Sequence, residues 1–391
     1  MDPGGVSPGW QPERLAFLLP NMGGGGAERV ALNLIRDFVG RGYEVDLVLV
    51  RAGGELLAML PPEVRVVDLG AHRLVAAIRP LARYLRERRP HALQARMWPL
   101  TVVAILSRLL ARVPTRIVVS DHAPLSLQYA GQRRTLRLLK ATVRLFYPKA
   151  DARVVVSSGS ADDLAALGGI ARPSIHVLHN PVPDPGPPVR DPAIDALWGE
   201  ADGRLVTAGT LKPEKNHLLL IRAFALLRRH GRAARLMILG DGAMMPALRA
   251  EAARLGIAED VLLPGFVANP SAYLASADLF VLSSDFEGFG NVLIEAMRLG
   301  LGIVSTDCPH GPAEILDGGR FGRLVPCGDP AALAEGMEAA LAQPADGPAL
   351  RRRAEALSGS GTFDAWLALM LGRPLAADEV SRQGPRGRSA D

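Results

Sequence analysis

Residues 279–297 read LFVLSSDFEGFGNVLIEAM, and this segment gives the strongest indication of the fold. Its apolar start predicts a strand over residues 279–282, its apolar end predicts a helix, and glycines mark the loop between them. Glu287 then follows the carboxyl end of a strand, where open α/β sheets bind ligands, and Glu295 lies early in the helix. Because the N–H groups at a helix start suit an anion, the loop predicts a phosphate site.

The pair Glu287-x7-Glu295 in this context resembles the donor-site signature of the retaining nucleotide-sugar glycosyltransferases of family 4, which have the two-domain GT-B fold. The resemblance implies that Glu287 contacts the transferred sugar and that Glu295 bonds the ribose, since a carboxylate can accept from two neighbouring hydroxyls. The backbone implied to hold the diphosphate belongs to Gly288, Phe289, Gly290, Asn291 and Val292. The alternative is that Asn291, Glu295 and Arg298 form only the polar face of an amphipathic helix.

A run of four glycines follows the first predicted strand, Leu15–Leu19, and precedes a helical pattern that extends through Ile35. Such a run has an entropic cost, and it is explained if the backbone of Gly25 and Gly26 approaches a phosphate or sugar closely. The letters GGAER in this run resemble the N-terminal loop of the same glycosyltransferases. The alternative is a flexible turn without a ligand.

A third match covers Ser305–Leu316, with the letters STDCPHGPAEIL. It resembles the segment after the two-glutamate helix in bacterial members that elongate lipid-linked or surface polysaccharides. Cys308 and His310 lie in this segment, but two ligands without a partner pair do not make a metal site. We therefore expect no metal and no other cofactor beyond the nucleotide sugar.

Short β-branched runs alternate with helical patterns along the chain, which predicts parallel sheets covered by helices on both faces. The predicted strands are 15–19, 45–50, 64–68, 116–120, 153–157, 175–178, 204–208, 236–239, 261–263, 279–282 and 302–305. The proline-rich segment His179–Pro188 reads as a linker. We expect an acceptor-binding Rossmann-like domain over residues 1–183, a donor-binding one over 184–357, and a crossover helix at Thr362–Leu371 with a disordered tail within 358–391.

Charge divides along the same boundary. Residues 1–183 hold 24 Lys and Arg against 14 Asp and Glu, whereas the remainder holds 21 against 26. A basic first half indicates an anionic partner, and residues 133–149 combine basic and apolar side chains in the pattern of a helix lying on an anionic membrane. The alternative is a solvated helix in an arginine-rich protein. Nucleic acid is not expected, because only 5% of residues are aromatic and none interleave with the basic groups.

The longest apolar stretch, Leu100–Leu106, is too short to span a bilayer. The N-terminus has no basic region followed by an apolar one, so no signal peptide is expected. Two cysteines give no disulfide framework. We expect a cytoplasmic protein, with peripheral contact on the inner face of the plasma membrane.

The segment Asp121–Ser126 follows the predicted strand 116–120 and resembles the first-domain loop that brings a histidine to the sugar. His122 is therefore the candidate contact at the reacting sugar and a candidate acid–base group, with Asp121 as its orienter. Without the resemblance, a histidine at a strand end is a structural hydrogen-bonding residue.

The segment Ala208–His217 resembles the loop in which an arginine and a later lysine bind the diphosphate, whose charge grows as it departs. Lys215 fits the lysine. Thr210 stands at the arginine position and cannot replace a bidentate guanidinium, so Lys212 is the candidate substitute. Further on, Gly240 and Gly242 resemble the turn beneath the nucleotide, and Val267 lies in the stretch whose backbone reads the base.

These matches, in order from residue 14 to about 330, predict a retaining transferase. It moves a hexose or N-acetylhexosamine from a nucleotide-diphosphate sugar, with UDP favoured, to a lipid-linked or polysaccharide acceptor. No dedicated nucleophile stands out, which favours front-face displacement. Two alternatives stay open: a nucleotide-sugar epimerase or hydrolase of the same fold, and, because of Thr210, an inactive nucleotide-sugar-binding partner of a glycan-assembly complex.

Overall fold

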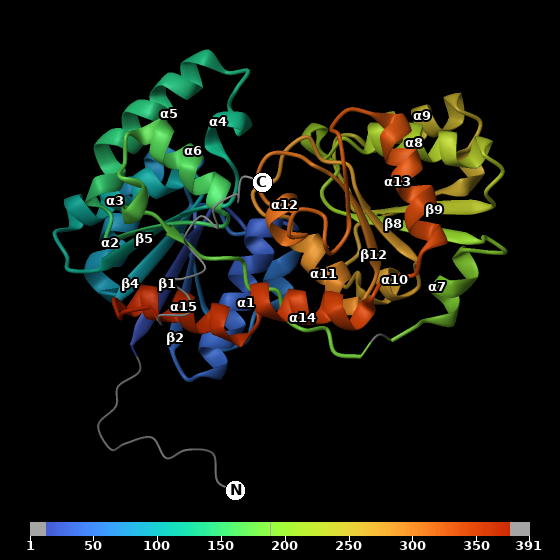
Figure 1. Cartoon of the computed structure of the whole chain (residues 1–391). Coiled ribbons are helices and arrows are strands. Elements are labelled where there is room, and N and C mark those ends of the chain that lie inside the picture. Colours follow the sequence, from blue (N-terminus) through green and yellow to red (C-terminus); the bar gives the residue numbers. More distant parts are fainter. Residues whose placement is uncertain (1–12, 188, 376–391) are drawn as a thin grey trace, which may run out of the picture.

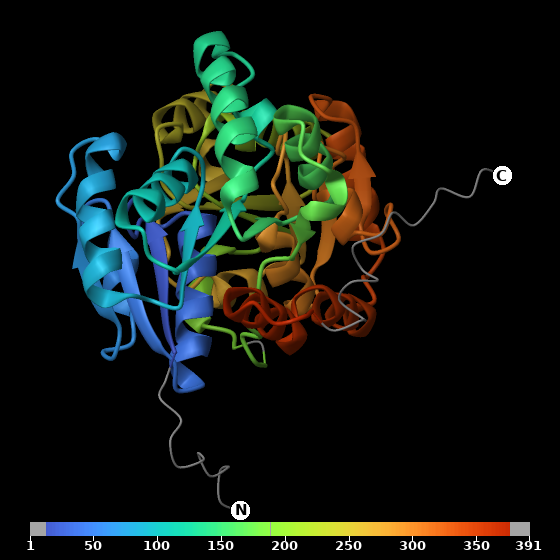
Figure 2. The ribbon, with the colours of Figure 1, turned by 90° about the vertical axis from the view of Figure 1, so that its left-hand side faces the viewer.

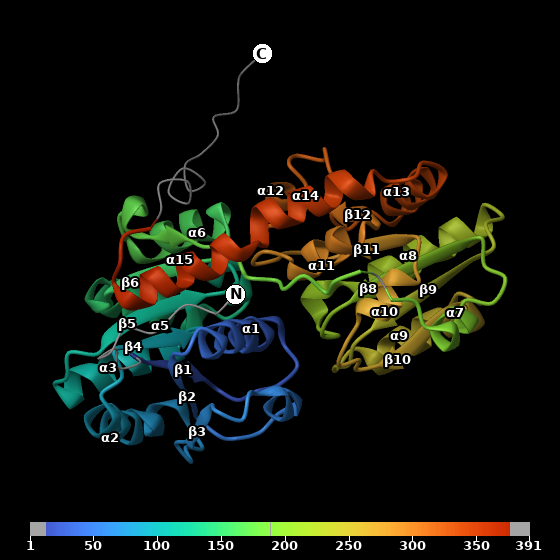
Figure 3. The same ribbon diagram turned by 90° about the horizontal axis from the view of Figure 1, so that it is seen from below.

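The computed structural model describes residues 13–187 and 189–375 and shows two α/β domains joined by a linker (Figure 1). Within these residues each domain contains one parallel sheet, of seven strands in the first domain and six in the second. Helices lie on both faces of each sheet (Figures 1 and 3). The predicted fold class, two doubly wound Rossmann-like domains, is confirmed.

The first sheet has the strand order β3-β2-β1-β4-β5-β6-β7. Its strands are β1 (Arg14–Leu19), β2 (Glu44–Leu49), β3 (Arg65–Asp68), β4 (Ala92–Arg96), β5 (Arg116–Asp121), β6 (Ala152–Val155) and β7 (His176–Val177). The helices of this domain are α1 (Gly26–Gly40), α2 (Ile78–Arg88), α3 (Leu100–Ala111), α4 (Leu125–Gln128), α5 (Arg133–Phe146) and α6 (Ser158–Gly168). Strand β1 and the first part of β5 are apolar and buried on both faces, as expected where helices cover both faces of a sheet.

The second sheet has the order β10-β9-β8-β11-β12-β13. Its strands are β8 (Gly203–Ala208), β9 (Ala234–Leu239), β10 (Val261–Gly265), β11 (Leu279–Leu282), β12 (Gly302–Thr306) and β13 (Arg323–Val325). Its helices are α7 (Pro192–Leu197), α8 (His217–Arg229), α9 (Met245–Arg254), α10 (Ser271–Ala275), α11 (Asn291–Leu299), α12 (Pro312–Ile315), α13 (Pro330–Ala342) and α14 (Gly347–Ser358). The quoted stretch forms β11, the loop after it and the start of α11, as predicted.

Strand β4 was not expected from the sequence. Its letters, ALQAR, contain no β-branched or aromatic residue, so β propensity gives no signal. All five residues are nevertheless buried, because β4 lies between β1 and β5 in the middle of the sheet. Strand β13 was also missed, and it lies at the edge of the second sheet.

The chain passes between the domains twice. The described residues of 178–191 contain no helix or strand and connect β7 to α7. At the other crossing, α14 packs on α11 in the second domain, and the next helix, α15 (Ser360–Leu371), packs on the first domain (Figures 1 and 3). Trp366 of α15 is fully buried in the same cluster as Phe17 of β1. The predicted tails, 1–12 and 376–391, lie outside the described residues.

Candidate active site between the two domains

The loops after β8 and β11 are tied together at the carboxyl edge of the second sheet, where these strands are neighbours. The Asn216 side-chain amide donates to the Asp285 carboxylate over 2.8 Å. The Ser283 hydroxyl donates to the backbone carbonyl of Lys215 over 2.9 Å. These bonds hold Lys215 and Glu287 next to each other, although they lie far apart in sequence.

Glu287 accepts hydrogen bonds from two side chains at this edge of the sheet. The Lys215 ammonium donates to both of its carboxylate oxygens, at 2.6 and 2.8 Å. The Ser284 hydroxyl donates to Glu287 Oε1 at 2.6 Å. Glu287 is only 6% exposed, so its charge is compensated by these two donors rather than by solvent. The diphosphate contact expected of Lys215 stays a prediction, because the structure directs its ammonium to Glu287.

The first domain contacts this site at Gly288. A Cβ atom at Gly288 would lie 1.9 Å from the backbone oxygen of His122, so no larger residue fits there without moving the loop. The Ser160 hydroxyl, from α6 of the first domain, donates to the Gly288 carbonyl over 3.4 Å. The loops that carry Glu287 and His122 are therefore in direct contact across the domain interface.

Two polar side chains from strands of the first sheet contact the His122 ring. Its Nε2 lies 3.0 Å from Arg96 Nη1 and 3.2 Å from Ser120 Oγ. Arg96 and Ser120 are partners in the register of β4 and β5, which places both under the loop. Burial and the Arg96 charge lower the pKa of His122 well below its usual value.

Asp121 does not orient His122, contrary to the prediction from sequence. Its carboxylate accepts from the Tyr147 hydroxyl at 2.8 Å and from the Trp98 backbone N–H at 3.1 Å. Successive residues of a strand point to opposite faces, so Asp121 turns into the domain core as the chain leaves β5. Burial raises the pKa of Asp121 to about 6.

Glu295 lies near the first domain through Arg29 of α1. Burial raises the pKa of the Glu295 carboxyl, and the Arg29 charge partly offsets this. The Arg29 guanidinium also donates to the backbone oxygens of Val267 at 3.3 Å and Ala268 at 3.2 Å. It lies 5.8 Å from the centre of the Phe266 ring. Arg29 thus contacts the segment that was predicted to read the base.

Gly25 and Gly26 of the glycine-rich loop differ in the space beside them. A Cβ atom at Gly25 would lie 2.5 Å from Glu28 Oε2, whereas the space beside Gly26 is open. Burial raises the pKa of Glu28, and the charges of Lys212 and Arg96 lower it in part. Lys212 of the second domain therefore acts on the first helix of the first domain.

Gly240 and Gly242 support the loop that carries Thr210 and Lys212. A Cβ atom at Gly240 would lie 1.9 Å from the Gly209 oxygen, and one at Gly242 would lie 2.5 Å from the Leu211 oxygen. Both glycines are thus required by close backbone packing. Thr210 is half-buried in this loop and the Lys212 side chain is exposed.

The side chains at the start of α11 contact the linker between the domains. Phe289 is buried and stacks on His179, with ring centres 4.6 Å apart and planes inclined by 17°. The Asn291 side-chain oxygen accepts from Asn180 over 2.8 Å. Gly290 has a φ of 100° just before the helix, and the side chain of Val292 is half-buried. The backbone N–H groups of this turn remain the predicted diphosphate contacts.

Glu314 of the third matched segment bridges the domains, which the sequence did not suggest. Its carboxylate accepts from the backbone N–H of Ser158, at the start of α6, over 3.0 Å and lies 2.8 Å from His179 Nε2. These contacts lower the pKa of Glu314 despite its burial. A carboxylate at a helix start is favoured by the helix dipole, so Glu314 stabilises the contact between the domains.

The other site residues that sequence reasoning missed are Ser284, Arg29 and Arg96. Ser284 and Arg29 lie inside the quoted motifs, so attention to the polar letters of those motifs would have found them. Arg96 had no signal, because it ends the unpredicted strand β4.

Among residues 13–187 and 189–375, no three or more His, Cys, Asp or Glu side chains are arranged to hold a metal ion. Cys308 is buried, and burial raises the pKa of its thiol. His310 packs instead against α6, where its Nδ1 would lie 1.9 Å from a Cβ atom at Gly159.

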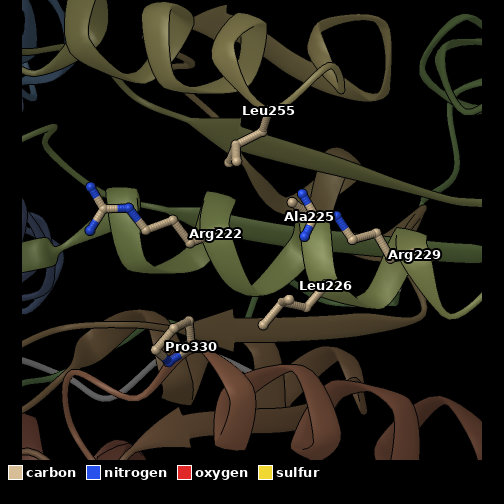
Figure 4. Close-up of a pocket in the computed structure, with 6 residues that line it drawn as sticks. All are labelled: Arg222, Ala225, Leu226, Arg229, Leu255 and Pro330. Carbon is tan, nitrogen blue, oxygen red and sulfur yellow. The ribbon is translucent and has the colours of Figure 1, made fainter.

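A hollow on the second domain lies on the outer side of α8 (Figure 4). It is lined by Arg222, Ala225, Leu226, Arg229, Leu255 and Pro330. Arg222 is paired there with Glu251 at 2.7 Å. Neither Glu287 nor Lys215 contributes to this hollow, so it is separate from the candidate active site.

Two family models match the chain, one for each domain. The model described as glycosyltransferase family 4 matches residues 24–184, and the model described as glycosyl transferases group 1 matches residues 202–343. No helix in the described part of the chain has the length and apolar character to cross a bilayer.

Named proteins resemble the chain, two of the three over most of its length and one over less than half. It is 29% identical to the N-acetylgalactosamine-N,N'-diacetylbacillosaminyl-diphospho-undecaprenol 4-alpha-N-acetylgalactosaminyltransferase of Campylobacter jejuni, over 84% of this chain and 90% of that one. It is 31% identical to the lipopolysaccharide 1,6-galactosyltransferase of Salmonella typhimurium over 45% of this chain and 48% of that one. The crystal structure of Anabaena HepE with UDP and glucose superposes with a TM-score of 0.78 at 20% identity, covering 92% of this chain and 99% of that one.

The motif order, the two parallel-sheet domains and the two family models agree. The chain belongs to the glycosyltransferases that combine an N-terminal glycosyltransferase family 4 domain with a C-terminal glycosyl transferases group 1 domain, and it has the GT-B fold.

Proposed function

We propose that this glycosyltransferase moves a hexose or N-acetylhexosamine from a UDP-sugar, with retention of configuration, to a lipid-linked or polysaccharide acceptor. The observation that carries the proposal is the buried carboxylate of Glu287, held by Lys215 and Ser284 directly beside the His122 loop of the other domain. Such a carboxylate is rigid and can accept hydrogen bonds from sugar hydroxyls while the donor is bound.

The donor would lie along the carboxyl edge of the second sheet. Glu295 would bond the ribose and the backbone of Val267 the base, and the start of α11 would receive the diphosphate. Lys212, on a loop supported by glycines, would supply positive charge. Arg29 now bonds the Val267 oxygen, so it would have to shift for a base to reach that position.

A front-face displacement fits the contacts of Glu287 better than attack by a nucleophile. Its oxygens already accept three hydrogen bonds, which lowers their reactivity toward a sugar carbon. In the proposed step, the bond from sugar C1 to the phosphate oxygen breaks as the bond from C1 to the acceptor oxygen forms on the same face. The acceptor proton passes to the leaving phosphate. No metal is required in this scheme, so activity should persist in EDTA, and Mn²⁺-dependent recovery from EDTA would contradict it.

Two relatives support the linkage and the acceptor class. The Campylobacter enzyme named above, and a second one that is 25% identical over 84% of this chain, carry names with alpha linkages and diphospho- or PP-undecaprenol acceptors. If the donor is an α-configured nucleotide sugar, an α-linked product means retention.

Helix α5 supports contact with an anionic membrane or with the phosphates of a lipid-linked acceptor. It projects from the first domain (Figures 1 and 2), and two of its leucines, Leu138 and Leu145, are 57% and 58% exposed. The exposed basic residues on the same helix are Arg133, Arg134, Arg137, Lys140 and Arg144. Leucines flanked by cations suit the surface of an anionic bilayer, which would place the enzyme peripherally on the inner face of the plasma membrane.

Vesicle sedimentation tests this surface. A variant with glutamate at four positions should not bind anionic vesicles and should stay in the supernatant. These positions are Arg133, Arg134, Arg137 and Lys140. Wild type should behave in the same way in high salt. Equal pelleting of wild type and variant, or no binding by wild type, would remove α5 from the proposal.

A panel of labelled UDP- and GDP-sugars, offered with a lipid-linked diphosphate acceptor, tests the function itself. Label in the acceptor, with its anomeric configuration read by NMR, supports retaining transfer. Free sugar would indicate a hydrolase, and a changed sugar on the nucleotide would indicate an epimerase. Binding without turnover would indicate an inactive partner, the alternative that Thr210 keeps open.

A further inference from the structure

Arg96 is a fully buried guanidinium whose hydrogen-bond acceptors are all neutral. It ends β4 and donates to the Ala27 carbonyl at 3.2 Å and to Gln94 Oε1 at 3.0 Å. Its third contact is His122 Nε2, at 3.0 Å. The Trp366 ring of α15 lies 5.7 Å away on its other side. A buried charge is unfavourable, and the Glu28 charge offsets the burial of Arg96 only in part, so the place of Arg96 beside His122 calls for an explanation.

The contact between Arg96 and His122 fixes a proton position. A guanidinium has donors but no acceptor. Burial lowers the pKa of Arg96 to about 9, so Arg96 still keeps its proton between about pH 6 and pH 8. In this contact His122 Nε2 must therefore be the acceptor, which requires a neutral ring with its proton on Nδ1. The Ser120 hydroxyl, 3.2 Å from the same Nε2, is compatible with that arrangement because it can donate or turn away.

We propose that Arg96 is a positioning residue that holds His122 as the neutral Nδ1–H tautomer, so that His122 acts on the donor sugar as a fixed hydrogen-bond donor and not as an acid–base group. This inference rests on the proposed function of His122 at the sugar. It differs from the expectation drawn from sequence, in which an imidazole titrating near working pH assists the acceptor.

The groups around His122 favour the neutral ring. From β4 comes the Arg96 cation, which repels an imidazolium. From the linker comes Asn180, which is neutral but whose side chain interacts with the ring and raises the pKa of His122 in part, and from the second domain comes the backbone at Gly288. Glu28 of α1 acts on Arg96, and Glu287 is engaged by Lys215. No carboxylate is recorded in hydrogen-bond contact with the ring among the described residues.

The other ring nitrogen, Nδ1, could donate to a ligand. His122 Nδ1 is buried and has no hydrogen-bond partner within the described residues. The side-chain oxygen of Asn180, the nearby polar residue, also has none. A buried N–H without a partner is unfavourable, and a hydroxyl of the transferred sugar placed beside His122 would satisfy it. The Asn180 side chain also interacts with the ring, so a sugar hydroxyl would compete with the Asn180 oxygen for the Nδ1–H.

Nitrogen NMR of the full-length protein labelled with ¹⁵N-histidine tests the tautomer without any substrate. The His122 signals are assigned by their loss in His122→Asn. In wild type we expect a protonated Nδ1 and an unprotonated Nε2 from about pH 6 to pH 8. In Arg96→Gln the ring should titrate closer to the ordinary pKa of about 6.5. Arg96→Lys, which keeps a cationic donor, should restore the wild-type spectrum.

Arg153→Gln is the matched control. Arg153 is a partly buried arginine of the same sheet, and its guanidinium donates to the backbone oxygens of Tyr147, Ala150 and Ser174 without contacting His122. Its loss should leave the His122 spectrum unchanged. If Arg96→Gln does not fold, the wild-type and Arg96→Lys spectra still decide the question.

Kinetics give a second readout. An asparagine amide nitrogen can replace Nδ1–H, whereas a glutamine nitrogen lies nearer to Nε2, so His122→Asn should retain kcat/KM about 10-fold better than His122→Gln. An Nε2–H ring or an imidazolium in wild type, or an unchanged ring in Arg96→Gln, would overturn the inference. If the spectra show the Nδ1–H tautomer but no sugar is transferred from any donor, the proposed function fails and the tautomer assignment stands.

Discussion

The pair of Lys215 and Glu287 allows a quantitative test of the candidate site. Lys215→Met keeps the apolar stem and removes the ammonium that donates to both carboxylate oxygens at 2.6 and 2.8 Å. Removing one partner of a buried pair typically costs about 3–5 kcal/mol. The Lys215 side chain is 26% exposed, so water already screens part of the interaction. We therefore expect the free energy of unfolding of the second domain to fall by about 2 kcal/mol.

A double-mutant cycle separates the pair from its surroundings. Glu287→Gln removes the negative charge and keeps the shape, so Lys215→Met should cost less in that background, with a coupling energy of about 1–2 kcal/mol. Lys212→Met is the matched control, because Lys212 lies on the same loop and its side chain is exposed. That change should stay within about 0.5 kcal/mol.

Urea unfolding followed by circular dichroism and tryptophan fluorescence provides the measurement. Trp198 is fully buried in the second domain and bonds Ser276 at 2.8 Å, so its emission reports on the domain that carries the pair. The two probes must agree before a single free energy is assigned. Additive effects of the two substitutions, within about 0.5 kcal/mol, would show that Lys215 does not hold the Glu287 carboxylate.

Three further outcomes are expected. Glu295→Ala should weaken UDP binding by about 1.5–3 kcal/mol in calorimetry, and unchanged affinity would refute its ribose contact. Thr210→Arg should fold normally and tighten UDP binding, and it should raise kcat only if the new charge contacts the departing phosphate. If Thr210→Arg instead weakens UDP binding, and Lys212→Ala leaves that binding unchanged, this loop does not face the diphosphate. The pKa of Asp121 is raised to about 6, above its value in the unfolded chain. In urea titrations, the free energy of unfolding of wild type should therefore rise relative to that of Asp121→Asn by about 2 kcal/mol as the pH falls from about 7 to 4.5. Parallel curves of stability against pH for the two proteins would contradict the burial argument.

Local patterns were enough to predict the two parallel-sheet domains. Strand β11 and the start of α11 follow directly from the switch between a run of four apolar residues and a glycine-rich loop. The linker was visible because proline interrupts both helix and sheet. Strand β4 could not be predicted, since its central place in the sheet overrides a composition that favours no strand.

Contacts between distant residues were beyond the reach of the sequence. Lys215 was expected at a phosphate because its loop resembles a known one, and nothing in the letters shows that β8 and β11 are neighbours whose loops bring it to Glu287. Arg96 and Glu314 were missed for the same reason. Arg96 bonds across to the loop after β5 and to α1, and Glu314 bonds the start of a helix in the other domain.

Because α15 lies near the end of the chain, the first domain stays incomplete until late in synthesis. Trp366 and Met370 complete an apolar cluster with strands of the first domain, yet roughly 190 residues separate them from β7, the last strand of that sheet. At bacterial rates of about 5–20 residues per second, the ribosome would need roughly 10–40 s to reach this helix. During that interval the nascent first domain would expose the apolar face that α15 later covers. A fragment ending at the linker should therefore aggregate or bind chaperones, whereas the second domain can complete its own sheet before synthesis ends.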